Sequence, residues 1–565
     1  MEIAVKKFSN AMCLKVPQPY ENAVMRVIDG RINKKWDCIV ARWSSVNCLK
    51  LAKSAQKLGW TVKPDEHFLE AIGPLSNRLE MPGFMTYQEV RQKSLNSFQD
   101  IQDNVMKTRL WNHQKEAFVE LHGLTGAILD MGMGTGKTAT SISLIMAGKH
   151  DFGIIICPKS VVPVWPMELD KHCAKKIMTY TGPKRKTSTI KQFTKDLIAK
   201  KEIAEALKEP FFLITNYEKM WQRELGEYLL GLKDIDFVVY DECHRLKTPS
   251  GSASRMAAKL RNNARRVLGC TGTLLPHSPM DAFGIFRAVD PAVFGTINML
   301  FRNEYAVIGG FEGKQIVGFK NQDKMHDMIQ TISYRVKSED VLDLPPFQHI
   351  VRHCELDTKT RKLYNEMHDD LCVEHEGHTL TAANALVKIL RLQQITSGIS
   401  TDMYGEEIML CKDGDLPEKA TLLADVLDDF AENEPLVVFC RFTADITAVR
   451  KVAERQGRQY FELSGKKNEL AEWQDNKQGI LAVQIRAGKE GVDFTISCTQ
   501  IYYSIGHSLG DYEQSLKRTH RPGQTRPVVY IHLVAKDTID EEVYESLDKK
   551  RDIVQHVLDN IQTKQ

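Results

Sequence analysis

The sequence predicts an α/β protein with two doubly wound lobes, helical insertions and a small N-terminal α+β module. Short apolar, β-branched segments bounded by turn residues alternate with helical patterns, which is typical of parallel sheets built from βαβ units. The apolar segments are nearly continuous, as expected for strands that helices cover on both faces. They form two series on either side of residues 278–435, so two lobes are the most economical interpretation.

The predicted strands follow the apolar segments. The first series comprises residues 127–129, 153–157, 211–214, 237–240 and 266–268. The second series comprises residues 436–440, 460–463, 480–483, 500–503 and 528–533. Between the two series, helical patterns lie at residues 281–290, 323–334, 357–372 and 381–397.

These patterns predict the domain boundaries of the two lobes. The first lobe is expected over residues 105–335, with its helical insertion from about residue 278, and the second over 351–540, with an insertion to about 430. The paired prolines of DLPPF (343–347) disfavour a helix, so residues 336–350 are predicted to be a linker. A charged amphipathic helix over 539–560, which Asp537 and Thr538 can cap, makes residues 541–565 a C-terminal brace.

Residues 1–85 have the pattern of a separate module. Apolar segments at 24–28 and 36–40 flank the turn Asp29-Gly30 and predict a hairpin, and a helix is expected at 45–58. The polar residues 86–104 are predicted to connect this module to the first lobe.

Composition limits the class of protein and its partners. The formal net charge is only +3, so any nucleic-acid contact has to come from a local groove. No apolar stretch reaches about eighteen residues, which predicts no membrane partner, and the N-terminus lacks the apolar core of a signal peptide. The twelve cysteines lack metal-ligand spacing and are expected to be reduced structural thiols. We expect a monomer in the cytoplasm of a bacterium or a virus-infected host cell, or in the nucleus if the source is eukaryotic.

The string MGMGTGKTAT at 131–140 predicts a phosphate-binding loop between a strand and a helix. Backbone N–H groups around Gly132, Gly134, Thr135 and Gly136 can converge on phosphates. Lys137 can neutralise the β and γ oxygens, and Thr138 can ligate magnesium. Met131 stands where the strict pattern has glycine. The alternative is an ordinary glycine-rich turn with a surface lysine.

The string DECH at 241–244 follows the apolar strand segment 237–240. An acidic pair at that end of a parallel sheet would face the phosphate loop. Asp241 can hold magnesium through water, and Glu242 can orient or deprotonate the attacking water. His244 can relay the nucleotide state to Thr271, Gly272 and Thr273. A solvated acidic turn and a merely packed histidine are the alternatives.

The string QSLKRTHRPGQ at 514–524 places Arg518 and Arg521 three residues apart, which predicts that both lie on one helix face. Guanidinium groups suit the charge of a phosphoryl-transfer transition state. A basic surface helix is the alternative. The three strings together predict an ATP site between two lobes.

The ordered motifs resemble the superfamily-two helicase-like ATPases, and within them the Swi/Snf-type DNA translocases, over about residues 105–545. The resemblance rests on RLWNHQKEAF (109–118), CPKSVVPVWPMEL (157–169), ITNYE (214–218), DECHRLK (241–247), GCTGTLLPHSPMD (269–281), RAGKEGVDFT (486–495) and QSLKRTHRPGQ (514–524). It implies two RecA-like lobes that use ATP and Mg²⁺.

The resemblance also implies roles for further residues. Arg109, Gln114, Gly491 and Asp493 would contact the nucleotide, with Gln114 at the adenine, and Gln514 would join the coupling residues. Lys159, Ser160, Thr215, Asn216, Arg486, Lys489 and Thr495 are the implied DNA contacts. Leu274, His277, Lys489 and Asp493 depart from common family residues. These departures leave the hydrolytic groups intact but can alter how hydrolysis is coupled to movement.

The sequence therefore predicts a DNA-dependent ATPase that translocates on duplex DNA to remodel DNA structures or protein–DNA complexes. Its expected partners are double-stranded or branched DNA and replication or repair proteins. A strand-separating DNA or RNA helicase and a recognition scaffold with a vestigial ATPase are the alternatives. The segment around Trp36 is similar to HARP-type domains. Trp36 and Trp43 can stack on bases and Arg31, Lys34, Lys35 and Arg42 can contact phosphates, which predicts that the module steers the motor to branched DNA. The alternative is a purely stabilising module.

Overall fold

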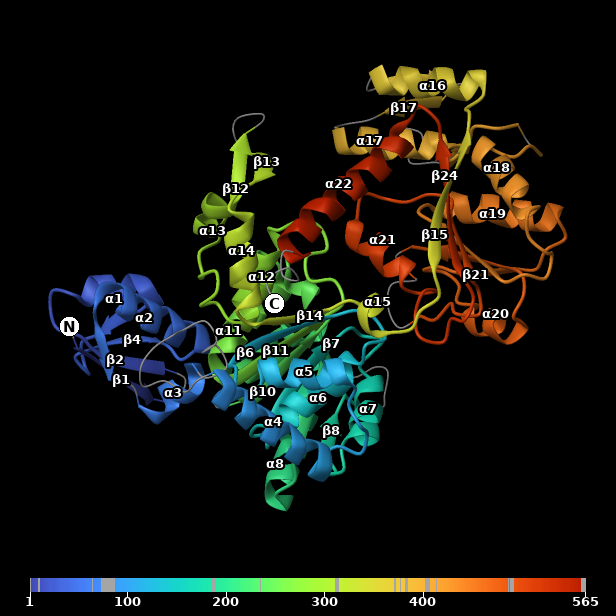
Figure 1. Ribbon diagram of the computed structural model, residues 1–565. Helices are drawn as coiled ribbons and strands as arrows, with labels where there is room; N and C mark the ends of the chain where they lie inside the picture. Colours follow the sequence, from blue (N-terminus) through green and yellow to red (C-terminus); the bar gives the residue numbers. More distant parts are fainter. Residues whose placement is uncertain are drawn as a thin grey trace. The chain divides into compact units, whose positions relative to one another are not determined.

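The computed structural model describes residues 2–8, 11–63, 65–72, 87–183, 189–233, 235–309, 315–369, 372–375, 378–381, 385–401, 407–412, 414–485, 487 and 492–559. The chain divides into two compact units (Figure 1). Unit 1 comprises Met1–Val341 and Val554–Gln565, and unit 2 comprises Leu342–Ile553. Within the described ranges, no helix is both long and apolar enough to cross a bilayer.

Unit 1 is built on a seven-stranded sheet in which every neighbouring pair is parallel. The strand order is β14-β6-β11-β10-β7-β9-β8. All five strands predicted for the first lobe are present, so this part of the α/β prediction is confirmed. The bounds are β6 (Gly126–Met131), β7 (Phe152–Cys157), β8 (Met178–Tyr180), β9 (Phe211–Asn216), β10 (Ile235–Asp241), β11 (Ala264–Thr271) and β14 (Ser333–Val336).

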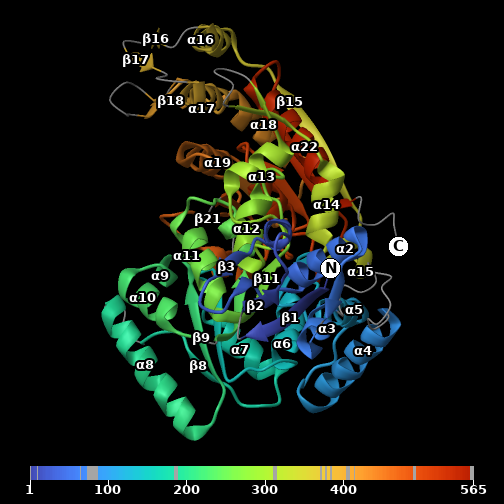
Figure 2. The same cartoon turned by 90° about the vertical axis from the view of Figure 1, so that its left-hand side faces the viewer.

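Helices cover both faces of this sheet. Figure 2 shows α8 and α10 on one side of the strands and α4 and α5 on the other. The bounds are α4 (Tyr87–Asn104), α5 (Asn112–Leu121), α6 (Lys137–Met146), α7 (Val164–His172), α8 (Ile190–Leu207), α9 (Tyr217–Met220), α10 (Arg223–Gly231), η2 (Cys243–Leu246), α11 (Ser252–Leu260) and η3 (Arg261–Asn263). The polar connector of the sequence prediction is thus largely a helix, α4, which packs its buried Phe98 against Phe118 of α5.

The insertion of unit 1 is only partly helical. It contains α12 (Asp281–Val289), α13 (Asn298–Tyr305), α14 (Gln322–Gln330) and α15 (Ser338–Val341), together with a hairpin of β12 (Ala306–Gly309) and β13 (Gln315–Phe319). The predicted helix at 323–334 is wrong at its end, because α14 stops at Gln330 and Ser333–Val336 becomes β14. Pairing of β14 with β6 outweighs the helical pattern there.

Unit 2 contains a second parallel sheet, of six strands in the order β15-β24-β23-β20-β22-β21. All five predicted strands of the second series are present, at shifted ends for β22, β23 and β24. The bounds are β15 (Phe347–Cys354), β20 (Leu436–Cys440), β21 (Tyr460–Leu463), β22 (Ile480–Gln484), β23 (Thr499–Tyr502) and β24 (Val528–Ala535).

Strand β15 differs from the sequence prediction, because its first residues lie within the predicted linker 336–350. It pairs with β24 over eight residues but is mostly exposed, so its sequence FQHIVRHC lacks the apolar run of a central strand. His349 of β15 stacks on Tyr530 of β24, with ring centroids 4.9 Å apart. Backbone hydrogen bonds to β24 and side-chain stacking across the two strands stabilise this edge strand. It therefore needs few apolar residues, and its sequence does not look like that of a buried strand.

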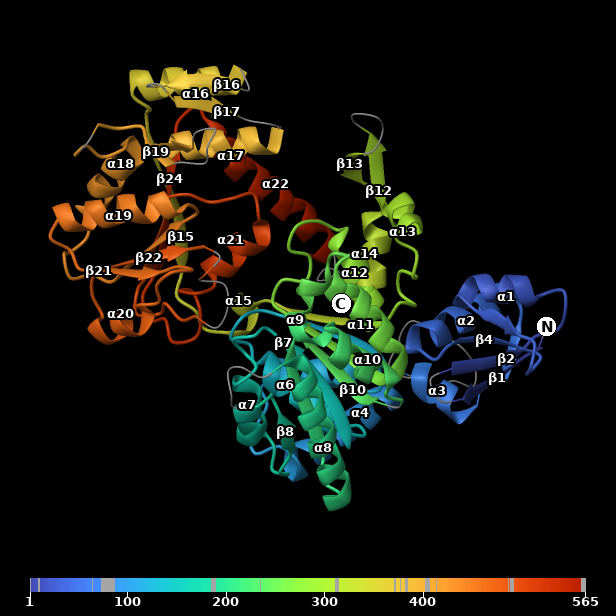
Figure 3. The same cartoon turned by 180° about the vertical axis from the view of Figure 1, so that it is seen from behind.

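Unit 2 also contains helices and two short hairpins outside this sheet. They are α16 (Thr358–Asp369), β16 (Cys372–His375), β17 (His378–Thr381), α17 (Ala385–Thr396), β18 (Ile399–Thr401), β19 (Glu407–Met409), α18 (Glu418–Leu427), α19 (Thr443–Arg455), α20 (Leu470–Asn476) and α21 (Leu509–Leu516). The last helix, α22 (Ile539–Asp559), begins in unit 2 (Figure 3).

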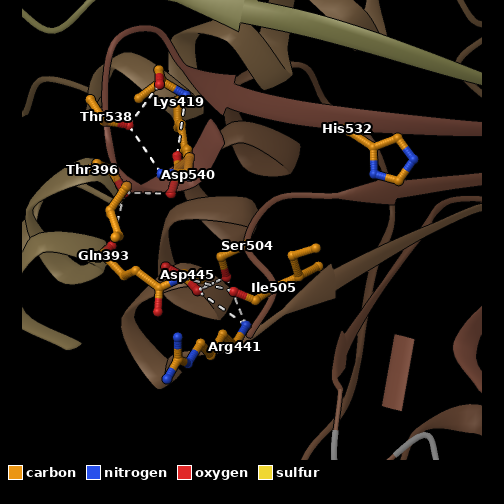
Figure 4. Close-up of polar contacts among 12 residues, drawn as sticks. Gln393, Thr396, Lys419, Arg441, Asp445, Ser504, Ile505, His532, Thr538 and Asp540 are labelled. Carbon is orange, nitrogen blue, oxygen red and sulfur yellow. Dashed lines mark hydrogen bonds and ion pairs between the residues drawn. The ribbon is translucent and has the colours of Figure 1, made fainter. Parts of the chain in front are cut away.

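Buried polar contacts anchor the start of α22 (Figure 4). Lys419 Nζ lies 2.5 Å from Asp540 Oδ2, and Thr396 donates to the other carboxylate oxygen at 3.0 Å. Thr538 accepts from the N–H of Asp540 at 3.3 Å. Because the pair is almost fully buried, loss of either charge would leave the other uncompensated.

Among its described residues, the N-terminal module has a five-stranded sheet, ordered β3-β4-β2-β1-β5, and three helices. The predicted strand at 24–28 is wrong, because these residues end a helix whose buried Val24 and Ile28 lie four residues apart on one face. Helix α2 has the predicted bounds, with Ser44 as its N-cap. The bounds are β1 (Glu2–Phe8), β2 (Ala11–Lys15), α1 (Glu21–Ile28), β3 (Arg31–Asn33), β4 (Cys38–Arg42), α2 (Ser45–Leu58), β5 (Thr61–Lys63) and α3 (Glu66–Ile72).

The module packs on the sheet domain of unit 1 through polar contacts. Arg42 donates to the carbonyl of Arg261 at 2.5 Å, and Ser44 donates to the buried carboxylate of Asp290 at 2.9 Å. Trp43 is only 6% exposed, whereas Trp36 is 44% exposed. Trp43 is therefore a packed residue and Arg42 bonds to the neighbouring sheet domain in this conformation, while their contact with DNA stays a prediction.

Candidate functional site

The phosphate loop, residues 131–138, joins the end of β6 to the start of α6. Strand β6 is buried along its whole length, so its end is fixed in the sheet. Gly134 and Gly136 have φ of 77° and 80°, a region that favours glycine. The Lys137 side chain turns back toward the loop, and its Nζ donates to the carbonyl of Met131 at 3.0 Å and to that of Gly132 at 3.1 Å. The Lys137 ammonium group therefore lies beside the backbone of the phosphate loop.

Gly132 has a packing role that the sequence prediction missed. A Cβ added at Gly132 would lie 2.2 Å from Ser338 Oγ and 2.6 Å from the Ser338 backbone nitrogen. Ser338 donates its hydroxyl to the carbonyl of Met133 at 2.8 Å, and the Gly132 N–H bonds to Val336 at 2.9 Å. The segment after β14 therefore braces the phosphate loop. Ser338 lies about 200 positions from the loop in the sequence, so no local pattern could identify it.

Gln114 connects α5 to the same loop. Its side chain accepts from the N–H of Trp111 and donates to the carbonyl of Thr135, both at 2.9 Å. His113 Nε2 also lies 2.8 Å from that carbonyl. Gln114 is buried, and an added Cβ at Gly136 would lie 2.0 Å from its Nε2. In this conformation Gln114 positions the loop, while the nearby Arg109 is exposed.

Asp241 is the last residue of β10, two strands from β6 in the sheet. Trp165 Nε1 donates to its Oδ2 at 3.0 Å. Burial and the neighbouring Glu242 carboxylate raise the pKa of Asp241 to about 6, against the effects of the Trp165 N–H and the Lys137 charge. A divalent cation at this carboxylate would relieve that repulsion. Asp241 and the Thr138 hydroxyl are oxygen ligands of the kind Mg²⁺ prefers, so the residues fit the predicted ion.

Glu242, His244 and Thr271 form a hydrogen-bonded cluster. His244 Nδ1 lies 3.2 Å from Glu242 Oε2 and 3.0 Å from Thr271 Oγ1. The Thr271 hydroxyl also accepts from the N–H of Thr273 at 3.1 Å. Glu242 itself adopts φ 54°, a strained conformation for a non-glycine residue, of the kind found at active sites. The structure thus brings together the predicted water-activating and coupling residues.

Gly272 lies beside the lysine of the phosphate loop. An added Cβ would be 3.3 Å from the carbonyl of Met131 and 3.4 Å from Lys137 Nζ. The segment after β11 therefore contacts the loop directly, because β11 lies between β6 and β10.

The two predicted arginines of unit 2 do not lie on a helix, which corrects the sequence prediction. Helix α21 ends at Leu516, and Arg518 and Arg521 follow in turns. Pro522 lies six residues beyond Leu516, so it does not set this end, and tertiary contacts decide the backbone around Arg518. The Arg518 carbonyl instead accepts from the N–H of Phe494 at 3.1 Å.

Both arginines nevertheless converge on one backbone oxygen. The Nη1 atoms of Arg518 and Arg521 lie 3.5 and 3.3 Å from the carbonyl of Val492. Arg518 is 4% exposed, whereas the Arg521 side chain is 27% exposed and lies 4.0 Å from Asp493. Arg521 Nε has no acceptor among the described residues. Arg521 is therefore the more accessible of the two guanidinium groups.

Part of the predicted site in unit 2 lies outside the described residues, namely Arg486, Lys489 and Gly491. Asp493 accepts from the N–H of Thr495 at 2.8 Å, and Gln524 donates to the Thr495 carbonyl at 3.2 Å. The predicted coupling residue Gln514 lies in α21.

Of the four predicted DNA contacts in unit 1, two are exposed and two are buried. Lys159 and Ser160 are exposed in the turn after β7. Thr215 is 1% exposed, and its hydroxyl has no partner within the described chain. Asn216 is 5% exposed and caps α9 by accepting from the N–H of Lys219 at 2.9 Å. Thr215 and Asn216 are thus buried in this conformation, and their contact with DNA stays a prediction.

Comparisons with known proteins show similarity over most of the chain. An uncharacterized ATP-dependent helicase of Mycoplasma genitalium is 23% identical and covers 87% of this chain and 47% of that protein. The chromodomain-helicase-DNA-binding protein 1-like of Danio rerio is 26% identical, covering 74% of this chain and 40% of that protein. The chain spans about half the length of the curated relatives it matches.

Among solved structures, the Sulfolobus solfataricus SWI2/SNF2 ATPase core in complex with dsDNA aligns with 80% of this chain and 94% of that chain. Its sequence identity is 18% and its TM-score 0.36. A model of the SNF2-related domain matches residues 60–400, which is more than half of the 565 residues. That match confirms the family that the sequence motifs predicted: the chain belongs to the SNF2-related proteins.

Proposed function

We propose that this protein is a DNA-dependent ATPase that translocates on duplex DNA. The observation that carries the proposal is the arrangement in unit 1. Lys137 begins α6 after the loop that follows β6, Asp241 ends β10, and the Glu242–His244–Thr271 cluster lies where β10 and β11 end. These groups thus share the carboxyl ends of neighbouring strands of one parallel sheet. Ligands of such sheets bind beyond the carboxyl ends of the strands. The names of relatives, which include ATP-dependent helicases and a DNA-binding protein, support the proposal.

Each group of the cluster has a role in phosphoryl transfer. Lys137 would contact the β and γ phosphates, while the N–H groups of the loop would surround them. Thr138 and, through water, Asp241 would hold magnesium, which would neutralise charge on the phosphates. Glu242 would orient the attacking water and accept its proton. Arg518 and Arg521 would stabilise the transition-state charge during turnover.

His244 links this chemistry to the segment after β11. Its ring contacts both Glu242 and Thr271, so a change in the direction of the Glu242 carboxylate would be felt at Thr271 and Thr273. That contact supports the coupling role proposed for Gly272 and its neighbours, because the same segment touches the phosphate loop.

The exposed Lys159 and Ser160 are the candidate DNA contacts of unit 1, together with Lys219. The pKa of Lys219 is lowered by burial and by the nearby Lys159 charge, so the two lysines lie close enough to repel each other. A phosphate between them would relieve that repulsion. Such contacts do not depend on base sequence and weaken as salt rises.

The test is the polymer that stimulates ATP hydrolysis. Equal masses of duplex DNA, single-stranded DNA and RNA are added to the full-length protein, and phosphate release is measured. We expect the largest stimulation by duplex DNA, increasing with duplex length. Stimulation by RNA alone, or efficient separation of a blunt duplex, would instead identify a strand-separating helicase. No ATP turnover under any condition would identify a binding protein with a vestigial site.

A further inference from the structure

Two aromatic side chains hold Asp241 from different segments of unit 1. Trp165 Nε1 donates to Asp241 Oδ2 at 3.0 Å, and the Tyr217 hydroxyl donates to the Asp241 carbonyl at 2.8 Å. Both aromatic residues are buried, at 2% and 3% exposure. One bond thus fixes the carboxylate, and the other fixes the backbone that carries it.

Trp165 belongs to the segment that presents the exposed Lys159 and Ser160. Backbone bonds join this segment into a tight series of turns: the Val161 N–H donates to Pro158 at 2.9 Å, and the Trp165 N–H donates to Val161 at 3.3 Å. A displacement at Lys159 would therefore be passed to the Trp165 indole over a few residues of hydrogen-bonded backbone.

Tyr217 belongs to a second segment on the same edge of the sheet. It begins α9, directly after Asn216, whose side chain caps that short helix at Lys219. Strand β7 lies between β10 and β9, and Cys157 at its end pairs with Asn216. Asp241 and the two segments thus lie together at the carboxyl ends of the neighbouring strands β10, β7 and β9. Lys159 belongs to the first segment and Lys219 to the second.

We propose that Trp165 and Tyr217 are positioning residues that couple DNA bound at Lys159 and Lys219 to the orientation of Asp241. The inference rests on the proposed function, since it names the route by which one ligand acts on the other. Neither residue needs to touch DNA or nucleotide. Coupling of this kind is reciprocal, so nucleotide has to change the affinity for DNA by the same factor as DNA changes the affinity for nucleotide.

The test measures that factor in the full-length protein. The Kd of a fluorescently labelled duplex is determined with and without a non-hydrolysable ATP analogue and magnesium, and the ratio of the two values is the coupling factor. Tyr217→Phe removes one hydroxyl and keeps the ring. Tyr180→Phe is the matched control, because the buried Tyr180 of the same sheet also donates to a backbone carbonyl, that of Phe193, at 3.2 Å.

We expect Tyr217→Phe to bring the coupling factor about two- to tenfold closer to one, the range expected for loss of one hydrogen bond. The Kd for duplex alone and for analogue alone should change less, and Tyr180→Phe should keep the wild-type factor. Trp165→Phe should act in the same direction. Its thermal midpoint is measured alongside, because this variant also removes buried volume.

The outcomes separate this inference from the proposed function. Wild-type coupling in both Tyr217→Phe and Trp165→Phe, with binding of both ligands retained, would overturn the positioning role and leave the ATPase assignment untouched. An equal loss of coupling in Tyr180→Phe would show a general packing effect and would also overturn it. Duplex that neither stimulates wild-type hydrolysis nor responds to the analogue would overturn the proposed function first.

Discussion

The proposed hydrolytic cluster of unit 1 and the arginine segment of unit 2 hold their charged side chains in different ways. Lys137 begins α6 after the phosphate loop that follows the buried strand β6, Asp241 ends β10, and Glu242 is fixed by His244 and Thr271. Arg518 and Arg521 stand in turns beyond a helix and share a single carbonyl at 3.5 and 3.3 Å. The first arrangement is a preorganised site. The second places its guanidinium groups in turns rather than behind a buried strand, which suits groups that we propose act at one stage of turnover.

The largest expected effects on ATP turnover come from substitutions in the cluster of unit 1. Lys137→Ala and Glu242→Gln should both abolish turnover, but only Lys137→Ala should weaken ATP binding, since it removes a cation from the phosphates. Glu242→Gln should retain ATP. Turnover by phosphate release and affinity for a labelled ATP analogue distinguish the two variants. Equal nucleotide affinity in both would contradict the assigned roles.

On the arginine side, Arg521→Ala should lower DNA-stimulated kcat by about a thousandfold or more, the scale of arginine fingers. The affinity for ATP should fall less, because the residue acts in the transition state. Steady-state kinetics with saturating duplex measures both quantities. Normal turnover on DNA would show that the arginine segment takes no part in hydrolysis.

The packing of Ser338 against the phosphate loop can be tested without removing a group that is proposed to act in hydrolysis. Gly132→Ala places a methyl group against Ser338 and should cost about 1–3 kcal/mol by overpacking, with weaker ATP binding. Gly231→Ala is the control, because an added Cβ there meets no atom within 4 Å. Thermal midpoints and analogue affinity measure the effect. Equal behaviour of the two variants would remove the proposed link between loop and brace.

The sequence predicted strand-anchored features better than features that depend on tertiary contacts. The apolar strands of both sheets and the groups at their ends follow from local pattern and the geometry of parallel sheets. The edge strand β15 and the end of α14 do not, because pairing with β24 and β6 decides them. Ser338 was missed for the same reason. The arginine pair lies in turns instead of on the predicted helix, because tertiary contacts such as the bond from the Phe494 N–H to the Arg518 carbonyl decide the backbone there.

The smallest expected effect concerns the N-terminal module. Trp36 lies against Phe8, with ring centroids 5.2 Å apart, and Lys34 and Lys35 beside it are exposed. If Trp36 stacks on a base at a branch, Trp36→Ala should reduce the preference for forks over plain duplex by about fivefold or more. Plain-duplex ATPase should stay unchanged. Competition binding with forked and linear DNA measures the preference, and an unchanged ratio would leave the module a stabilising role.

Movement along duplex DNA is tested most directly by triplex displacement. A labelled third strand is annealed to a long duplex, and its release by the full-length protein is followed with ATP, without ATP, and with Glu242→Gln. We expect release that requires ATP, is absent in Glu242→Gln, and leaves the two duplex strands paired. Duplex-stimulated hydrolysis without any release, or release that needs no ATP, would contradict a duplex translocase.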